Sequence, residues 1–274
     1  MGTTAPDPLE MLAVAERAVA EVEDLFRDNL GAAPTVRKPD GSCVTAIDMA
    51  VEERLRDRLT TATGLPFHGE ESGGGDPARS TVWIVDPVDG TTNYANGHTA
   101  CAILVSLVHE GRPIASVTSL PIARIRVTAA EGHGVRRNGE PSRPRRQRGV
   151  PVPVGFGSVI AGREGRFPRA WRRGLLTSVG ERLPAIRISG SVGYDLAMTA
   201  TGTYGGAVTF SPNIWDNAAG VLAVRESGGV VTDLAGRDWT LDSVGVLAGT
   251  PAVHEQLLEA IGDVAPPSVL RGRT

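Results

Sequence analysis

The stretch Trp83-Ile-Val-Asp-Pro-Val-Asp-Gly-Thr-Thr-Asn93 places two carboxylates, Asp86 and Asp89, at the end of an apolar strand and directly before a Gly-Thr-Thr turn. Carboxylate oxygens are ligands that Mg²⁺ favours in proteins. The turn can offer backbone N–H groups and a hydroxyl to an anion, above all where it opens a helix. The stretch therefore predicts a site that binds a metal ion and a phosphate group together.

The composition of the 274-residue chain is that of an ordinary globular protein, with 41% hydrophobic and 22% charged residues. Its net charge of −3 gives no electrostatic reason to expect nucleic acid or an anionic membrane as a partner. No apolar run is long enough to span a bilayer, and the N-terminus carries no signal-peptide pattern. With two cysteines, Cys43 and Cys101, no disulfide framework is expected. We therefore expect a reduced, cytoplasmic protein.

Lys38 is the single lysine among 28 basic residues. A general bias towards arginine would explain this. A second explanation is a role that needs a compact ammonium group, because the planar guanidinium of arginine does not replace it. Composition leaves both open, and the sequence around Lys38, discussed below, favours the second.

Apolar residues at helical spacing predict helices over residues 7–30, from Thr45 onward, and over 169–179, 191–201, 214–226 and 251–261. Runs rich in Val, Ile and Thr predict strands over 81–85, 101–108, 114–120, 124–130, 185–188, 205–210, 228–232 and 244–248. Turn residues at 109–113 and 137–139 separate some of these strands. We expect helices and strands to mix in layers, with more antiparallel pairs than a Rossmann-type sheet contains.

Four features could meet at one site: Gly69-Glu-Glu-Ser72, the pair of aspartates after the strand, Trp215-Asp216, and the segment from Lys38 to Asp48. Each also has a purely structural explanation. Glu70 and its neighbour could be loop charges, and Asp216 could cap a helix. Asp48 lies three residues after Thr45, which is the spacing of a capping box. Spacing alone leaves these alternatives open.

Together these segments resemble the inositol monophosphatase family of Mg²⁺-dependent, lithium-sensitive phosphatases. The matching segments are Lys38-Pro-Asp-Gly-Ser-Cys-Val-Thr-Ala-Ile-Asp48, Gly69-Glu-Glu-Ser72, Trp83-Ile-Val-Asp-Pro-Val-Asp-Gly-Thr-Thr-Asn93, Gly190-Ser191 and Trp215-Asp-Asn-Ala-Ala-Gly220, in the family's order and approximate spacing. The resemblance implies a mixed α+β and α/β fold, a layered αβαβα sandwich. It also implies one domain over residues 1–274, with packed halves at about 1–140 and 141–274, and assembly as a homodimer.

The resemblance also implies roles for individual residues, with two to three Mg²⁺ ions per site. Glu70, Asp86 and the carbonyl of Val88 would bind one ion, and Asp86, Asp89 and Asp216 a second. Catalysis would use a metal-activated water helped by Glu70 and Thr91, with Asp48 orienting Thr91 and Lys38 adding positive charge. The residues that would contact the substrate are Asp89, Gly90, Thr91, Thr92, Gly190, Ser191, Val192 and Thr209.

One departure from the family concerns the substrate. Members that act on inositol phosphate carry a glutamate seven residues before the Trp-Asp aspartate, and this chain has Thr209 there. Losing a hydrogen bond to a substrate hydroxyl can change discrimination strongly. We therefore predict a phosphomonoesterase for a small metabolite, either a sugar, cyclitol or amino-alcohol phosphate or a nucleoside monophosphate. The alternative is a non-catalytic or moonlighting protein that binds the transcription machinery, as some relatives do.

Overall fold

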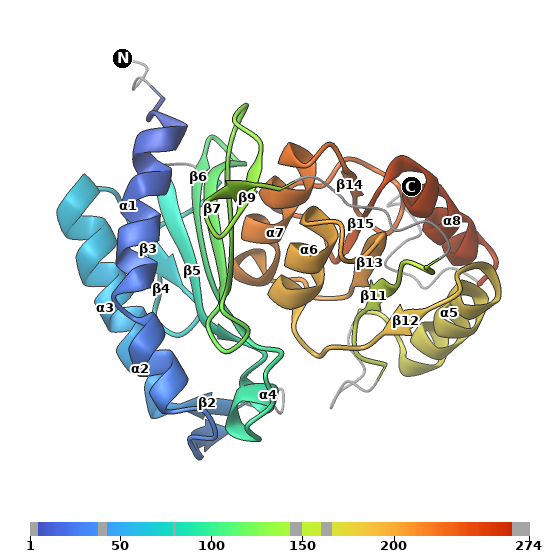
Figure 1. The fold of residues 1–274 in the computed structure, drawn as a ribbon, viewed down its shortest axis with the longest axis horizontal. Helices are drawn as coiled ribbons and strands as arrows, with labels where there is room; N and C mark the ends of the chain where they lie inside the picture. The colour runs from blue at the N-terminus through green and yellow to red at the C-terminus, as the bar shows by residue number, and fades with distance from the viewer. Residues whose placement is uncertain (1–4, 38–42, 79–80, 143–149, 160–165, 265–274) are drawn as a thin grey trace.

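A computed structural model describes residues 5–37, 43–78, 81–142, 150–159 and 166–264. The elements stack as five alternating layers of helix and sheet, which run from left to right in Figure 1. The outer layer at the left contains α1 (Pro8–Ala20), α2 (Glu23–Asp28) and α3 (Ala46–Thr63). The expected αβαβα sandwich is confirmed.

The first helix begins as the sequence predicts, because the Asp7 side chain accepts from the N–H groups of Leu9 and Glu10 and Pro8 lies in the first turn. The prediction of one helix over residues 7–30 is wrong. At Val22 the N–H bonds to Val19 O at 3.1 Å, three residues back, and a turn separates α1 from α2. The turn keeps both Val22 and Phe26 fully buried against the neighbouring sheet.

The second layer is an eight-stranded sheet in the order β10-β9-β8-β7-β6-β5-β3-β4. Its strands are β3 (Phe67–Gly69), β4 (Gly73–Gly74), β5 (Val82–Asp89), β6 (Ala102–His109), β7 (Arg112–Leu120), β8 (Ile125–Ala130), β9 (Val135–Arg137) and β10 (Glu140–Pro141). All neighbouring strands are antiparallel except β3 and β5. The parallel pair brings the C-terminal ends of β3 and β5 to the same edge.

Two of the predicted turns connect strands of this sheet by two residues each. Glu110 and Gly111 have φ of 47° and 78°, and Asn138 and Gly139 have φ of 51° and 81°. Positive φ at both central residues is the type I′ geometry, whose twist matches that of the strands it joins. The predicted turns are confirmed.

The middle layer is formed by α6 (Val192–Ala200) and α7 (Ile214–Glu226), which lie between the two sheets in Figure 1. The second sheet has the order β12-β11-β13-β15-β14, from β11 (Val154–Phe156), β12 (Ile186–Arg187), β13 (Gly206–Thr209), β14 (Val230–Thr232) and β15 (Val246–Gly249). The last layer is α5 (Arg169–Arg182) and α8 (Pro251–Gly262). A separate two-stranded sheet, β1 (Pro34–Arg37) with β2 (Cys43–Thr45), lies near the short helix α4 (Thr91–Ala95).

Three hydrophobic cores fill the spaces between the five layers, and alternate residues of β5 contribute to two of them. Trp83 and Val85 pack with α1 and α3, whereas Val82 and Ile84 pack with α6 and α7. A strand buried on both faces needs apolar residues at successive positions. This explains why the stretch before Asp86 is a continuous apolar run and not an alternating one.

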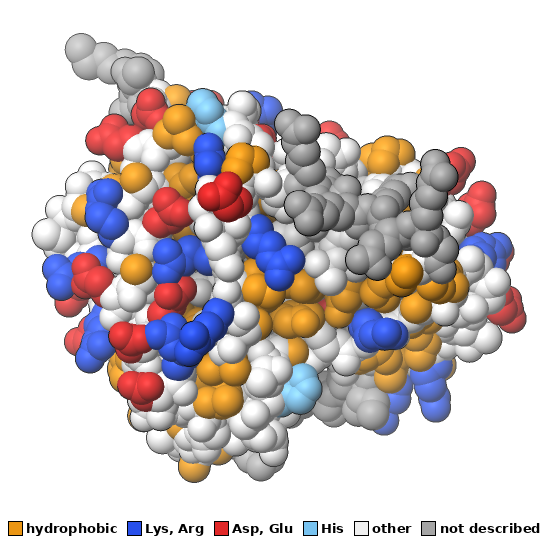
Figure 2. Space-filling view, in the orientation of Figure 1, with side chains coloured by type: hydrophobic (Ala, Val, Ile, Leu, Met, Phe, Trp, Pro, Cys, Tyr) orange, Lys and Arg blue, Asp and Glu red, His pale blue; other side chains and the backbone are white. Residues whose placement is uncertain are grey.

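On the face shown in Figure 2, acidic and basic side chains are interspersed over the helices at the left. Among the helices that the structure describes, none is both long enough and apolar enough to cross a membrane.

Candidate active site

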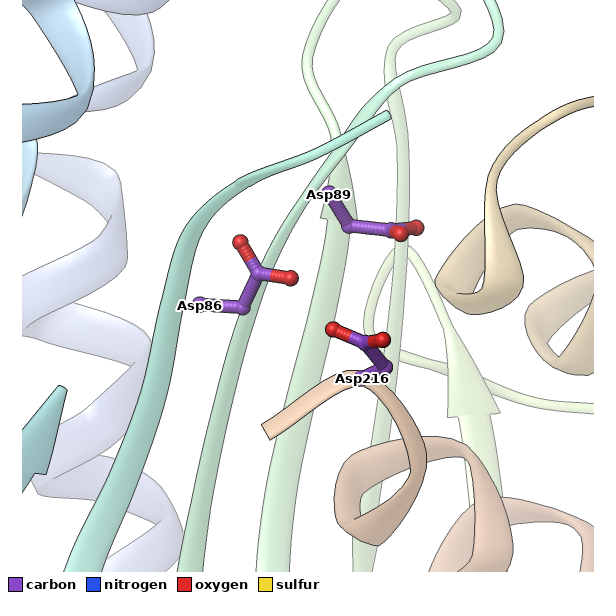
Figure 3. Close-up of side chains that lie close together, drawn as sticks. All are labelled: Asp86, Asp89 and Asp216. Atoms are coloured by element: carbon purple, nitrogen blue, oxygen red, sulfur yellow. The ribbon is translucent and has the colours of Figure 1, made fainter. Parts of the chain in front are cut away.

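Three aspartates from two layers point their carboxylates toward one another (Figure 3). Asp86 and Asp89 lie at the end of β5, and Asp216 lies in the first turn of α7. One carboxylate oxygen from each lies within 4.8 Å of the others. Asp86 and Asp89 are buried, and Asp216 is partly buried.

A β-bulge puts the two aspartates of β5 on one side of the strand. Asp86 pairs with Leu104 and Asp89 with Ala102, so three residues along β5 match two along β6. In a regular strand, residues three apart point to opposite faces, and one extra residue restores a common face. Pro87 lies inside this bulge. Proline has no N–H to donate to the ladder, and a central strand tolerates it at a bulge because the ladder is already interrupted there.

Crowding makes the three carboxylates reluctant to ionise. Burial, together with the charges of Glu70, Asp216 and Asp89, raises the pKa of Asp86 well above its ordinary value. Burial also raises the pKa of Asp89 to about 6, and burial with the Asp89 charge raises the pKa of Asp216 to about 7. A site of this kind favours either bound protons or a bound cation.

Glu70 joins the cluster through the parallel pair of strands. Gly69 pairs with Val85, and the Glu70 N–H donates to Val85 O at 3.0 Å, so Glu70 follows β3 beside Asp86. The Glu70 and Asp86 side chains are in hydrogen-bonding contact. A buried residue that the sequence analysis did not single out, Glu52, supports this segment by accepting the Glu71 N–H at 2.9 Å. Nothing in the local sequence distinguishes Glu52 from a surface glutamate of α3.

Asp89 is fixed by the start of α6. Its carboxylate accepts from the N–H of Val192 at 3.2 Å, from the N–H of Gly193 at 2.7 Å, and from the Ser191 hydroxyl. The N-terminus of a helix favours a negative charge. Gly193 is required for this approach, since a Cβ there would lie 2.4 Å from the Leu104 side chain and 3.0 Å from Asp89 Oδ2.

Thr91 connects the turn after β5 to the capping box of α3. Its Oγ1 lies 3.0 Å from Val88 O and 3.4 Å from Asp48 Oδ1. The other oxygen of Asp48 accepts from the N–H and the hydroxyl of Thr45 at 2.8 and 2.5 Å. Asp48 therefore serves as a helix cap and as a partner of Thr91 at once. Lys38 lies outside the described residues.

Four of the predicted substrate residues, Gly190, Ser191, Val192 and Thr209, line one pocket of about 280 Å³. Thr209 is fully buried, and its hydroxyl is used within the protein: it accepts the Val246 N–H at 3.1 Å and donates to Asn217 at 3.4 Å. Gly90 and Thr91 lie at the start of α4, and the exposed Thr92 follows them there. No described contact joins the Thr92 side chain to the aspartates.

Two further residues hold the site together without having been assigned a role from the sequence. Ser211 donates its hydroxyl to Asp216, and its position two residues before Asn213, where α7 starts, is the signal that could have found it. The Asn93 amide donates to the carbonyls of Ala100 and Ser189 at 2.7 and 2.8 Å. It thereby ties the Gly-Thr-Thr turn to the segment before α6.

The model of the inositol monophosphatase family matches residues 7–265. The chain belongs to this family. It is 39% identical to the inositol-1-monophosphatase ImpA of Mycolicibacterium smegmatis over 95% of this chain and 96% of that protein. It is 30% identical to the Nus factor SuhB of Pseudomonas aeruginosa over 95% of this chain and 99% of that protein. The structure of inositol monophosphatase from Anabaena superposes with a TM-score of 0.81 at 26% identity, over 95% of this chain and 98% of that one.

These similarities confirm the family and the enzyme class, a phosphoric monoester hydrolase, that the sequence segments predict. They cover nearly the whole chain, and the segments that carry the resemblance include those that supply the three aspartates.

Proposed function

We propose that this chain is a Mg²⁺-dependent phosphomonoesterase that hydrolyses the phosphate ester of a small hydroxylated metabolite. The observation that carries the proposal is the cluster of Asp86, Asp89 and Asp216, whose oxygens lie within 4.8 Å of one another. Mutually repelling carboxylates at this distance are stabilised by a divalent cation.

The residues of the cluster fit Mg²⁺. The cation favours carboxylate oxygens, keeps several of its waters and completes its shell with substrate phosphate. Asp86, Asp89 and Asp216 would hold the ions, with Glu70 and the carbonyl of Val88 beside them, and two to three ions per site is the expected number. Bound Mg²⁺ would polarise the phosphate ester and lower the pKa of a coordinated water.

The other residues of the site orient these groups. The Thr91 hydroxyl is within hydrogen-bonding distance of Val88 O and Asp48, which makes it a candidate to align the attacking water. The start of α6 holds the Asp89 carboxylate at a fixed angle through two N–H groups. The N–H groups of Gly90 and Thr91 begin a helical turn and are candidates to bind the phosphate oxygens.

The substrate class follows from two opposed observations. The name of the ImpA relative makes inositol 1-phosphate the first compound to test. Thr209, in contrast, carries no carboxylate, and its hydroxyl is already engaged with Val246 and Asn217. It therefore offers the ring of a cyclitol neither group. We therefore include sugar phosphates, histidinol phosphate and nucleoside monophosphates with inositol 1-phosphate as candidates.

Phosphate release measured with Mg²⁺ and with EDTA across this panel tests the proposal. We expect turnover of at least one compound with Mg²⁺ and none with EDTA. The Asp89→Asn variant should lose turnover yet remain folded by circular dichroism. Near-normal activity of that variant, or equal turnover in EDTA, would refute the metal assignment.

A second candidate function is a binding role in transcription, which rests on the 30% identity to a protein named Nus factor SuhB. The complete set of carboxylates in the cluster favours catalysis, because a purely structural descendant has no need to keep three repelling aspartates. Calorimetric titration with Mg²⁺ separates the two candidates. A folded protein that binds no Mg²⁺ and hydrolyses nothing would favour the binding role.

Three further features stay proposals. We propose that the protein acts in the cytoplasm, assembles as a homodimer and folds as one domain of two packed halves at about residues 1–140 and 141–274. Light scattering gives the assembly state directly, and a monomeric mass would overturn the homodimer.

A further inference from the structure

The pocket of about 280 Å³ contains a buried cation. Arg172 lines it together with residues on both sides of the aspartate cluster, and only 8% of Arg172 is exposed. Of these lining residues, Ser191 donates to Asp89 and Ser211 donates to Asp216. The pocket is therefore directly continuous with the shell of the cluster.

The Arg172 guanidinium is held rigidly, and no carboxylate of the described residues neutralises it. Its Nε donates to Phe167 O at 3.0 Å, its Nη1 donates to Ser158 O at 2.8 Å, and its Cζ lies 4.7 Å from the centre of the Phe210 ring. Both hydrogen bonds go to backbone carbonyls, and in the described part of the chain no carboxylate forms an ion pair with Arg172. Among the same residues, Nη2 has no hydrogen-bond acceptor. A buried charge without a counter-ion is costly unless a ligand supplies one.

The surroundings add to this positive character. Arg172 lies in the second turn of α5, and its bond to Phe167 O places the guanidinium over the start of that helix. The first turn of α5 has no acidic residue and no side-chain cap, so no side chain of the helix's own first turn offsets the positive end of its dipole. The pocket has one other charged group, Asp195. Burial raises the pKa of Asp195 well above its ordinary value.

We infer that the substrate carries a second anionic group, a carboxylate or a second phosphate, which Arg172 binds while the scissile phosphate lies at the aspartate cluster. The inference rests on the proposed phosphatase function. Arg172 would act as a specificity residue, since a planar guanidinium matches the two oxygens of either anion. The second group is recognised and not cleaved.

The test compares phosphate release from matched pairs of monoesters that differ in the second anion. For a carboxylate the pairs are glycerol 3-phosphate with 3-phosphoglycerate, and glucose 6-phosphate with 6-phosphogluconate. For a phosphate the pair is fructose 6-phosphate with fructose 1,6-bisphosphate. We expect kcat/KM to favour the doubly anionic member of at least one pair by roughly tenfold or more, the effect of one charge-assisted hydrogen bond.

Two variants one residue apart show whether Arg172 causes this preference. Arg172→Met removes the charge but keeps an apolar stem in the pocket, and it should cut the preference by roughly tenfold. Arg173→Met changes the exposed neighbour on the same helix and should leave the preference as it is. Thermal melting checks that both fold. If Arg172→Met does not fold, the substrate pairs on the unaltered protein still decide.

The outcomes are distinct. Turnover without preference in any pair overturns this inference and leaves the phosphatase function standing. A preference that survives in a folded Arg172→Met variant also overturns it, because another residue would then read the second anion. No turnover of any compound removes the phosphatase function and this inference with it.

Discussion

Replacing one carboxylate of the cluster should stabilise the metal-free protein. A carboxyl with a pKa of about 7 in the folded protein and 3.8 in the unfolded chain keeps a proton that the unfolded chain has released. As the pH rises from 3.8 to about 7, the unfolding free energy of the metal-free protein therefore falls. At pH 8 the loss from Asp216, relative to low pH, is about 4 kcal/mol. Asp216→Asn removes this loss, because an amide of the same shape does not ionise and can still accept from Ser211.

Urea unfolding followed by circular dichroism measures the effect, at pH 5 and pH 8, in EDTA and in Mg²⁺. In EDTA at pH 8 we expect Asp216→Asn to be more stable than the unaltered protein by roughly 2–4 kcal/mol. At pH 5 the gain should shrink. Mg²⁺ at about 100 times its Kd should stabilise the unaltered protein by about 2.7 kcal/mol and the variant by much less.

The control is Asp57→Asn, which removes an exposed carboxylate of α3 that does not belong to the aspartate cluster, and it should change neither value. The reasoning fails if Asp216→Asn is the less stable protein in EDTA at pH 8. It fails equally if Mg²⁺ protects both proteins to the same extent, because Asp216 would then contribute nothing to the cation site.

Three other predictions follow from the contacts of the site. Thr91→Val should lower kcat by roughly 10²–10⁴-fold with a small change in melting temperature, and Thr91→Ser should restore most of the rate. Gly193→Ala should cost about 1–3 kcal/mol in urea unfolding, because its Cβ has no room, whereas Gly180→Ala on an exposed helix should be neutral or stabilising. Thr209→Val should cost about 1–3 kcal/mol by leaving the buried Val246 N–H without an acceptor, yet KM should stay within about twofold; a large rise in KM would mean that residue 209 reads the substrate.

Elements with strong local signals could be predicted from the sequence, whereas several of the short strands could not. The helix over residues 214–226 matches α7 in full, because 13 residues are enough for a helical pattern to be read. The strands β1, β2, β3 and β11 have three or four residues each, too few for any period to emerge. Their positions are set by partners far along the chain. For example, β11 pairs with β12 and β13.

The site divides in the same way. The residue types and their order predict a metal and phosphate site, but contacts between distant segments decide what each residue does. Asp89 meets the N–H groups of α6 more than a hundred residues later, and Arg172 meets the pocket through α5. Neither contact has a sequence pattern, because the packing of layers brings the segments together.

The spacing of Asp86 and Asp89 shows how a local rule and the fold combine. Three residues apart in a regular strand, the two side chains would point into different layers, and no single ion could reach both. The extra residue at the bulge turns Asp89 back to the face of Asp86, toward the start of α6. Pro87 favours this bulge. Proline has no N–H to donate, and the ladder is locally interrupted at a bulge, so the missing donor costs little there. Deleting Val88 would remove the bulge together with its extra residue, so the two aspartates would stand two positions apart in a regular strand and would still share a face. What the deletion should remove is the Val88 carbonyl that accepts the Thr91 hydroxyl at 3.0 Å, so we expect it to harm the placement of Thr91 more than the pairing of the two aspartates.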